Sequence, residues 1–191
     1  MIDARPPCVL LPADRGVLEL GSEVTFKEVS KFDPRRDCLS SRRERFSPLA
    51  ARLMMAFLVP KQADAGGAVA RMWKVLAKYF TALPRPTDVK DGELWFQNAA
   101  GHAVPLSALS EGERAILLMF GEIALRTPKD GVVMIDEVEQ HLHPRWQREV
   151  LGALRALVPT AQIILTTQSP YVAADAPDDV LKLGDWDRDG A

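Results

Sequence analysis

The alternation of helical patterns with short apolar runs after Ser110 is the feature that most constrains the fold of this chain. We expect three helices there, over residues 110–126, over 144–157, and as a short segment near Pro170. We expect three strands, over residues 132–135, 162–166 and 180–183. The first two strands are rich in β-branched residues, which is typical of strands buried on both faces. Helices that alternate with such strands indicate an α/β domain with a mostly parallel sheet.

The half of the chain before Ser110 is organised differently. Residues 27–45 are dense in turn formers and hold seven Lys or Arg and four Asp or Glu. This composition favours a solvated charged segment and leaves open a basic patch for phosphate or nucleic acid. Helical spacing predicts a helix over 48–59, with Ser47 as N-cap and proline at its first position, and a second helix over 68–80.

Strand and turn signals complete this first half. Residues 9–12 form an apolar run that reads as a strand without a preceding partner, as expected of a domain that continues upstream. Leu83–Pro86 reads as a rigid connector because it holds two prolines. Residues 93–96 and 102–105 flank the turn-forming stretch Asn98–Gly101, and this arrangement predicts a hairpin.

Composition excludes several classes of protein. The chain has 191 residues, a formal net charge of −2, 47% hydrophobic and 26% charged residues, values typical of a globular domain and not of a disordered chain. The near-neutral charge gives no support for nucleic-acid binding by the chain as a whole. Two cysteines are too few for a disulfide framework. The longest strongly apolar run, 53–59, is too short for a membrane helix, so we expect a cytoplasmic protein with no membrane partner.

The strand over 132–135 ends in two adjacent carboxylates, Asp136 and Glu137. In open α/β sheets, ligands bind beyond the carboxyl ends of the strands, which places both acids where a site is expected. Successive residues of a strand point to opposite sides, so one acid could hold Mg²⁺ through water while the next addresses an attacking water. The alternative is that Asp136 only begins a loop or caps a helix.

Ser110, Glu111, Gly112 and Glu113 directly precede the long apolar helix. Ser110 and Glu113 fit the S-x-x-E capping box, in which two side chains satisfy backbone N–H groups at a helix start. Gly112 lies within the first turn, where glycine costs about 1 kcal/mol relative to alanine. A capping box does not need this glycine, whereas a loop that approaches a phosphate closely does. The two interpretations are compatible.

Two further polar stretches follow the strands. Thr166–Pro170 would place Gln168 at the same sheet edge as the acids if the two strands are neighbours, although Ser169 and Pro170 could also simply start the next helix. His141 and His143 form a His-x-His pair between the first strand and its helix. A metal site there lacks a third strong ligand candidate.

In this order and spacing, the four stretches resemble the carboxyl-terminal half of an ATP-binding-cassette-type ATPase, in the soluble AAA-like branch with RecF-like, SMC-like and OLD-like proteins. Residues 109–113 are similar to the signature motif of the family, and 132–137 to its Walker B strand and catalytic glutamate. Residues 138–144 resemble the D-loop, and 166–170 the switch motif. The resemblance covers about residues 106–183.

The resemblance implies a role for each residue. Asp136 would orient the Mg²⁺ shell, and Glu137 would act as general base on the attacking water. In this family two heads enclose ATP between them. Ser110, Gly112 and Glu113 would therefore face the nucleotide of a partner head, and His141 and His143 would be interface or packing residues.

Two departures from the family pattern matter. Many members carry histidine at the position of Gln168, and an amide can orient a γ-phosphate or a water but carries no proton charge. The phosphate loop of the family reads G-x-x-x-x-G-K-[ST], and no glycine of this chain is followed by lysine. Because the loop supplies several charge-assisted bonds to phosphate, we expect this chain alone to bind ATP weakly or not at all.

The resemblance also implies an architecture: an α/β fold with the mostly parallel sheet of a P-loop NTPase, as in an ATP-binding-cassette head, without the Walker A part. Residues 1–105 would be the N-terminal remainder of the head, with a helical insertion at about 47–80 and the hairpin at 93–105. Residues 106–184 would form the lobe that carries the motifs, and 185–191 a frayed tail.

The implied activity is Mg²⁺-dependent hydrolysis of ATP, in DNA repair, chromosome maintenance or phage defence, with the Walker A loop supplied upstream or by a partner. The implied partners are a second copy or another ATPase head, and further DNA or a nuclease or effector chain. One alternative is a non-catalytic interaction or regulatory module derived from such an ATPase. Another is a nuclease-type metal site at Asp136, Glu137 and His143, which would cleave DNA without ATP.

Overall fold

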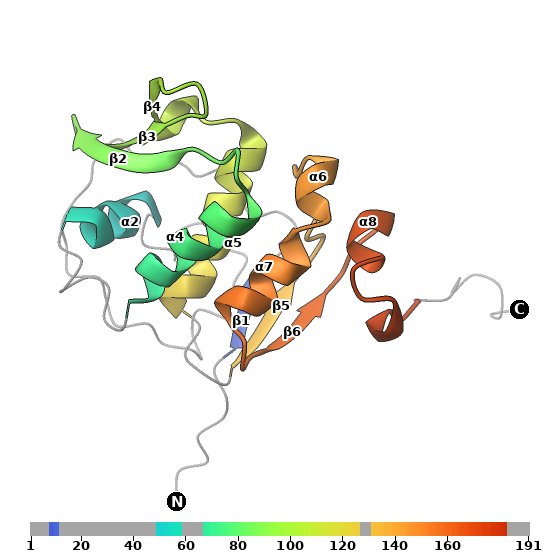
Figure 1. Ribbon diagram of the computed structural model, residues 1–191. Coiled ribbons are helices and arrows are strands. Elements are labelled where there is room, and N and C mark those ends of the chain that lie inside the picture. Colours follow the sequence, from blue (N-terminus) through green and yellow to red (C-terminus); the bar gives the residue numbers. More distant parts are fainter. Residues whose placement is uncertain (1–7, 12–48, 59–66, 127–130, 183–191) are drawn as a thin grey trace, which may run out of the picture.

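A three-stranded parallel sheet organises the carboxyl-terminal part of the molecule (Figure 1), whose computed structural model describes residues 8–11, 49–58, 67–126 and 131–182. The strand order is β1–β5–β6, with β1 at Cys8–Leu11, β5 at Val132–Ile135 and β6 at Gln162–Leu165. Both pairings are parallel, and their residues align from start to end, so the carboxyl ends of all three strands lie at the same end of the sheet. The predicted α/β class with a parallel sheet is therefore confirmed.

Helices cover one face of this sheet, and the other face is more open. Val133 and Ile135 of β5 are buried, whereas Met134 between them is half-buried. On the flanking strands, Leu10 is 39% exposed and Ile164 is 44% exposed. The prediction that both strands are buried on both faces is thus wrong. β5 is central but covered fully on one side only, and β6 is an edge strand within the described chain.

The principal helices are α4 (Ala68–Tyr79), α5 (Glu111–Arg126) and α7 (Val150–Leu157). α4 packs against both α5 and α7, and Figure 1 shows α7 in front of the parallel sheet. Phe80, just after α4, meets the rings of Phe120 and Trp146 edge-on at centroid distances of 5.5 and 5.8 Å. Such aromatic contacts add to the burial of apolar area in the shared core.

The segment predicted as one helix over 144–157 is two helices. α6 covers Pro144–Gln147, and α7 begins at Val150. Between them, the backbone N–H of Glu149 donates to the carbonyl of Trp146 at 3.1 Å, the tighter hydrogen-bond pattern of a 3₁₀ turn. This turn interrupts the α-helical ladder although the apolar spacing continues across it.

A second, antiparallel sheet joins β2 (Arg85–Lys90), β3 (Glu93–Gln97) and β4 (Ala103–Pro105). The predicted hairpin is confirmed by β3 and β4, but the predicted rigid connector is partly wrong because Arg85 and Pro86 belong to β2. Pro86 is tolerated because β2 is an edge strand with a register shift between Pro86 and Asp88. Figure 1 places this sheet beside α2 and away from the parallel sheet.

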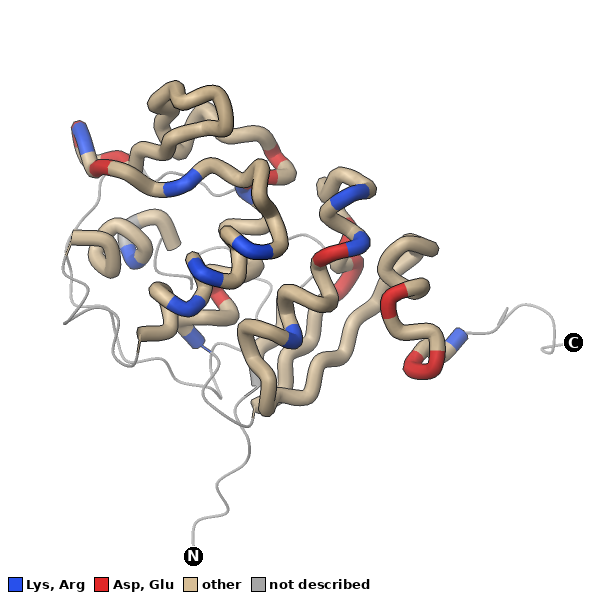
Figure 2. The backbone as a smooth tube through the Cα atoms, in the orientation of Figure 1, with Lys and Arg blue, Asp and Glu red and all other residues tan. Residues whose placement is uncertain are grey.

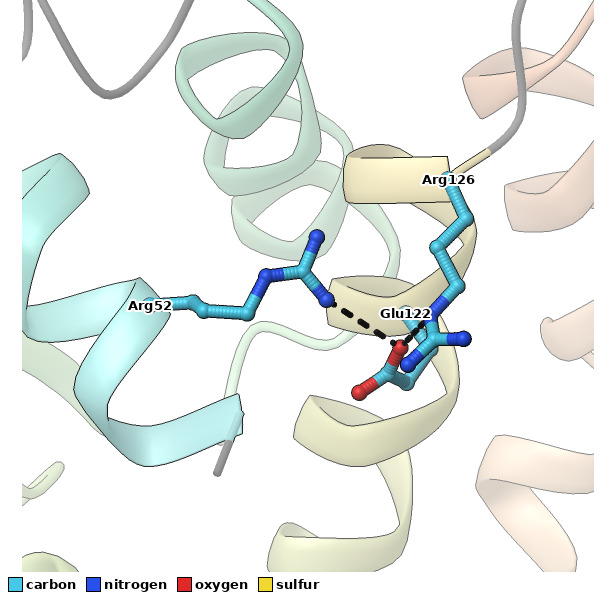
Figure 3. Close-up of polar contacts among 3 residues, drawn as sticks. All are labelled: Arg52, Glu122 and Arg126. Atoms are coloured by element: carbon cyan, nitrogen blue, oxygen red, sulfur yellow. Dashed lines mark hydrogen bonds and ion pairs between the residues drawn. The ribbon is translucent and has the colours of Figure 1, made fainter. Parts of the chain in front are cut away.

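The predicted helix over 48–59 corresponds to α2 (Leu49–Leu58), and the helix over 68–80 to α4. A buried ion cluster ties α2 to α5 (Figure 3). Glu122 of α5 is 4% exposed and pairs with Arg126 one turn later and with Arg52 of α2, at 3.6 Å from the latter. The carboxylate thus compensates two guanidinium groups inside the fold.

The helix near Pro170 is confirmed as α8 (Pro170–Ala173), which is followed by a 3₁₀ turn, η3 (Pro177–Asp179). The strand predicted over 180–183 is wrong for its described part. Residues 180–182 form neither a helix nor a strand, and Leu181 is 91% exposed. The charged segment 27–45, the N-cap at Ser47 and the tail 185–191 lie outside the described residues. Within the described ranges, every helix is too short or too polar to cross a membrane.

Candidate functional site

The candidate site is built at the carboxyl ends of β5 and β6. Asp136 and Glu137 follow β5 and Thr166 follows β6, and because these strands are neighbours, the three residues meet. The hydroxyl of Thr166 donates to Oδ1 of Asp136 and accepts from the backbone N–H of Glu137 at 2.8 Å. The sequence-based expectation that polar groups of both strands share one sheet edge is therefore correct.

Glu137 adopts a left-handed backbone conformation with φ of 46°. A non-glycine residue in this region costs of order 1–3 kcal/mol, which surrounding structure must hold in place. Here the N–H of Glu137 is bonded to Thr166, and the next N–H, of Val138, donates to the carbonyl of Thr166 at 3.1 Å. These two bonds hold the backbone turn at the second carboxylate in place.

A second set of bonds joins the two loops that follow the strands. Glu139 accepts from the hydroxyl of Thr167 through Oε2 and from the backbone N–H of Gln168 through Oε1, both at 2.6 Å. A carboxylate that accepts two such bonds is a strong, charge-assisted link. This role was not predicted from the sequence, although an acid two residues after Glu137 and a threonine after β6 were the available signal.

Gln147 extends the link to α6 and α8. Its amide nitrogen donates to the carbonyl of Leu142 at 2.8 Å, and its amide oxygen accepts from the hydroxyl of Ser169 at 2.6 Å. Ser169, which is 7% exposed, also accepts from the N–H of Tyr171 and so caps α8. The expectation that Ser169 and Pro170 start a helix is correct. The backbone of Gln168 thus lies between two anchored residues, while Gln168 itself is exposed.

The start of α5 is a capping box. The N–H and hydroxyl of Ser110 both donate to Oε2 of Glu113, at 2.7 and 2.8 Å, and the N–H of Glu113 donates back to the serine hydroxyl at 3.3 Å. The carboxylate of Glu113 is therefore engaged within its own helix turn. This is the local role that the spacing of the two residues predicted.

Gly112 has a reason in the fold itself. A Cβ at this position would lie 2.8 Å from the backbone carbonyl oxygen of His141 and 3.5 Å from the ring of Trp146. The expected reason for glycine at position 112 was close approach of a phosphate. In the structure the close approach is made by the loop after β5, so the need for glycine is explained without a ligand.

The two histidines have local partners. Nδ1 of His141 lies 3.5 Å from the carboxylate of Glu111, across two exposed side chains, and the backbone of His141 has a positive φ of 63°. Nδ1 of His143 accepts from the N–H of Arg145 and caps α6. His141 therefore joins the start of α5 to the loop after β5, and through it Ser110, Gly112 and Glu113 are connected to the Asp136 side of the site.

The donor set fits Mg²⁺ better than a transition metal. Asp136 and Thr166 present carboxylate and hydroxyl oxygens, which are the ligands of a hard cation that keeps water and phosphate in its shell. In the part of the chain that is described, no three His, Cys, Asp or Glu side chains gather to hold a metal by themselves. This arrangement gives no support to a nuclease-type site at Asp136, Glu137 and His143.

Comparison with known families identifies the group to which the molecule belongs. The family model described as "AAA domain, putative AbiEii toxin, Type IV TA system" matches residues 2–175. The chain is therefore a member of this family of AAA domains, and the resemblance to ATP-binding-cassette and AAA-like ATPases is confirmed.

Individual relatives support the same assignment. The chain is 32% identical over 94 residues to the "Retron Vc95 probable ATPase" of Vibrio cholerae, covering 44% of this chain and 18% of that protein. It is 44% identical over 62 residues to the "Septu protein PtuA" of Bacillus thuringiensis, covering 31% of this chain and 16% of that one. The chain thus spans less than a fifth of the length of these relatives.

Among solved structures, one reported for "ATP-driven dimerization and DNA stimulated activation of SMC ATPases" superposes with a TM-score of 0.44 at 17% identity, over 56% of this chain and 73% of the other. A second, an SMC head bound to the winged-helix domain of ScpA, gives a TM-score of 0.41 at 18% identity, over 56% of this chain and 36% of that one.

Proposed function

We propose that this chain is the part of an ATP-hydrolysing head that carries the Mg²⁺-orienting and water-activating carboxylates. The observation that supports this proposal best is the cluster at the ends of β5 and β6, where Thr166 bonds both Asp136 and the backbone of Glu137. Membership of an AAA family implies nucleotide binding, and phosphoryl transfer depends mostly on positioning and electrostatic stabilisation.

The proposed roles follow from this placement. Asp136 and the hydroxyl of Thr166 would hold the Mg²⁺ shell, and the ion would neutralise charge on the phosphates when bound. Glu137, whose backbone is left-handed, would accept a proton from the attacking water. Gln168, exposed on the loop after β6, would orient that water or the γ-phosphate through its amide.

The start of α5 would face the nucleotide of a partner head. Ser110 and Glu113 are engaged in the capping box, so the groups offered to an anion there are the backbone N–H groups of the first turn. Gly112 would serve this role indirectly, because it lets the loop at His141 pack against that turn. A second copy or another ATPase head, with the Walker A loop supplied upstream or by that partner, would complete the site.

The carboxylate of Glu137 is tested by Glu137→Gln in the assembly that hydrolyses ATP. We expect hydrolysis to slow by about 10²–10⁴-fold, since a positioned general base contributes that much, while nucleotide binding survives. Turnover and ATP binding are measured on the same preparation, with Glu149→Gln at the start of α7 as the matched control. Unchanged turnover in Glu137→Gln would remove this residue from the mechanism.

The second candidate function is a non-catalytic interaction or regulatory module, and one feature of the sequence supports it. No glycine of the 191 residues is followed by lysine, so no phosphate loop of the G-x-x-x-x-G-K-[ST] type is encoded in them. A module of this kind would keep the sheet and the linked loops but respond to a partner instead of hydrolysing ATP. Loss of ATP turnover from the assembly in Glu137→Gln would speak against it.

We also propose the division into residues 1–105, 106–184 and 185–191 with the helical insertion at about 47–80, and a cytoplasmic location. DNA repair, chromosome maintenance and phage defence remain the proposed settings, with DNA, a nuclease or an effector as further partners.

A further inference from the structure

One exposed side of α4 is strongly cationic. Arg71, Lys74 and Lys78 are all exposed and are spaced three and four positions apart, so they share one face of the helix. At 1.5 Å of rise per residue, this row extends over about 10 Å. Neither α4 nor the adjacent α7 contains an acidic residue, and Figure 2 shows the row along α4 without an acidic residue in that helix.

Within the described ranges, no acidic side chain forms an ion pair with this row. Among the described residues, the acidic side chains that form ion pairs do so with other bases, such as Asp88 with Lys90 and Asp179 with Arg155. Lys78 lies over the ring of Tyr79, 5.1 Å from its centroid, a contact that involves no acidic group. The row is thus a local positive surface on a chain of near-neutral net charge.

An apolar pocket of about 330 Å³ opens beside this row, between α4 and the start of β2. Trp73 and Ala77 line it from the helix, and Leu83 and Pro86 from the segment that leads into β2. Lys74 and Arg85 line the same pocket, so its two charged side chains are both cationic. The pocket is large enough for one aromatic or branched side chain.

We propose that the row Arg71, Lys74 and Lys78, together with this pocket, docks an acidic segment of a protein partner that inserts one aromatic or large aliphatic side chain as an anchor. Charge complementarity selects the acidic segment, and the apolar lining selects the anchor. A nucleic acid fits less well. A base buried there would leave its ring nitrogens and exocyclic groups without partners, because the lining is apolar apart from the two cations.

The proposal is tested by fluorescence anisotropy on the 191-residue chain with a labelled peptide, Asp-Asp-Trp-Asp-Glu-Asp. We expect saturable binding that weakens at least about tenfold when the tryptophan of the peptide is replaced by alanine. The triple variant Arg71→Glu, Lys74→Glu, Lys78→Glu should weaken binding at least about 30-fold, and the loss should shrink at high salt. These exposed positions are remote from the core, and a thermal melt checks that each variant folds.

Two variants separate the anchor from the charges. Ala77→Leu fills the pocket and keeps every charge. It should therefore weaken binding of the tryptophan peptide and leave binding of the alanine peptide unchanged. Lys182→Glu reverses one charge at the C-terminal end of the described chain, as each of the three α4 substitutions does, and should leave binding unaltered. Absence of peptide binding, or equal effects of Lys182→Glu and the α4 variants, would overturn the proposal. Tighter, α4-dependent binding of a labelled oligothymidylate would assign the surface to nucleic acid and overturn it as well.

Discussion

Gly112 shows how one residue can serve two neighbouring elements. Its missing side chain lets the loop at His141 reach the first turn of α5, where a Cβ would stand 2.8 Å from the carbonyl oxygen of His141. The atom in the way belongs to the backbone, which cannot rotate aside as a side chain can. The same glycine that weakens the helix locally therefore brings the start of α5 against the loop that follows the candidate carboxylates.

We predict that Gly112→Ala destabilises the chain, by about 1–2 kcal/mol, although alanine is the better helix former. The gain of about 1 kcal/mol in helix propensity would be outweighed by displacement of the His141 loop. Urea unfolding measures the change. Gly152→Ala in α7 is the control, because its Cβ would meet only the ring of Tyr79 at 3.2 Å. Equal stability of Gly112→Ala and the parent chain would contradict this account.

Glu139 is the residue whose removal should loosen the loop after β6. In Glu139→Ala, the hydroxyl of Thr167 and the N–H of Gln168 both lose their acceptor, and a bond to a charged group contributes about 1.5–3 kcal/mol. We expect a loss of stability in that range and faster hydrogen exchange at the Gln168 amide. Glu139→Gln keeps one carbonyl acceptor, so its stability and its exchange rate at Gln168 should lie between those of the parent chain and Glu139→Ala. Unchanged exchange at Gln168 would show that the loop is held by other contacts.

At the scale of elements, a buried ion cluster links α2 to α5. Glu122 is the one carboxylate between Arg52 and Arg126 in the contacts drawn in Figure 3, and Arg126 is 8% exposed. Removing the carboxylate would take from both guanidinium groups the partner that they share inside the fold. Breaking a buried pair in this way is far more costly than the pair is stabilising.

We therefore predict that Glu122→Ala destabilises the chain by about 3–5 kcal/mol. Arg155→Ala removes one partner of an exposed pair, with Asp179 at 3.2 Å, and should cost less than about 1 kcal/mol. Urea unfolding of the purified chain measures both losses of stability. The account fails if the two variants lose similar stability.

Elements with a strong local signal were predictable, and those that depend on neighbours were not. The helices α2, α4 and α5 follow from apolar residues that recur at helical spacing, which is a local property. β2 was missed because Pro86 argues against a strand unless the strand lies at an edge, which only pairing with β3 reveals. The turn between α6 and α7 was missed because the helical spacing of apolar residues continues from Trp146 to Val150, across the turn at Arg148 and Glu149.

At the scale of the whole molecule, the missing phosphate loop has a measurable consequence. We predict that the 191-residue chain alone binds ATP weakly or not at all, because the charge-assisted bonds of such a loop are not available from its sequence. Equilibrium binding of labelled ATP, with and without Mg²⁺, measures this. Tight binding by the chain alone would show that other groups can replace the loop.

Parts of the candidate site were readable from the sequence and parts were not. The order of Ser110–Glu113, Asp136–Glu137 and Thr166–Pro170 predicted the family and the sheet edge because both depend on motif spacing. The bonds of Glu139, and the bond between Gln147 and Ser169, were not predicted. They join residues about 20 to 30 positions apart, and nothing local in the sequence indicates which acceptor meets which donor.

The sequence by itself determined the α/β class, the helices with clear periodicity and the capping box at Ser110, because each rests on interactions between residues a few positions apart. Only the tertiary structure decided which sheet face stays open, why position 112 must be glycine, and how the loops after β5 and β6 are joined. These depend on which distant backbone and side-chain groups come within contact distance. Packing settles that distance, and spacing along the chain does not.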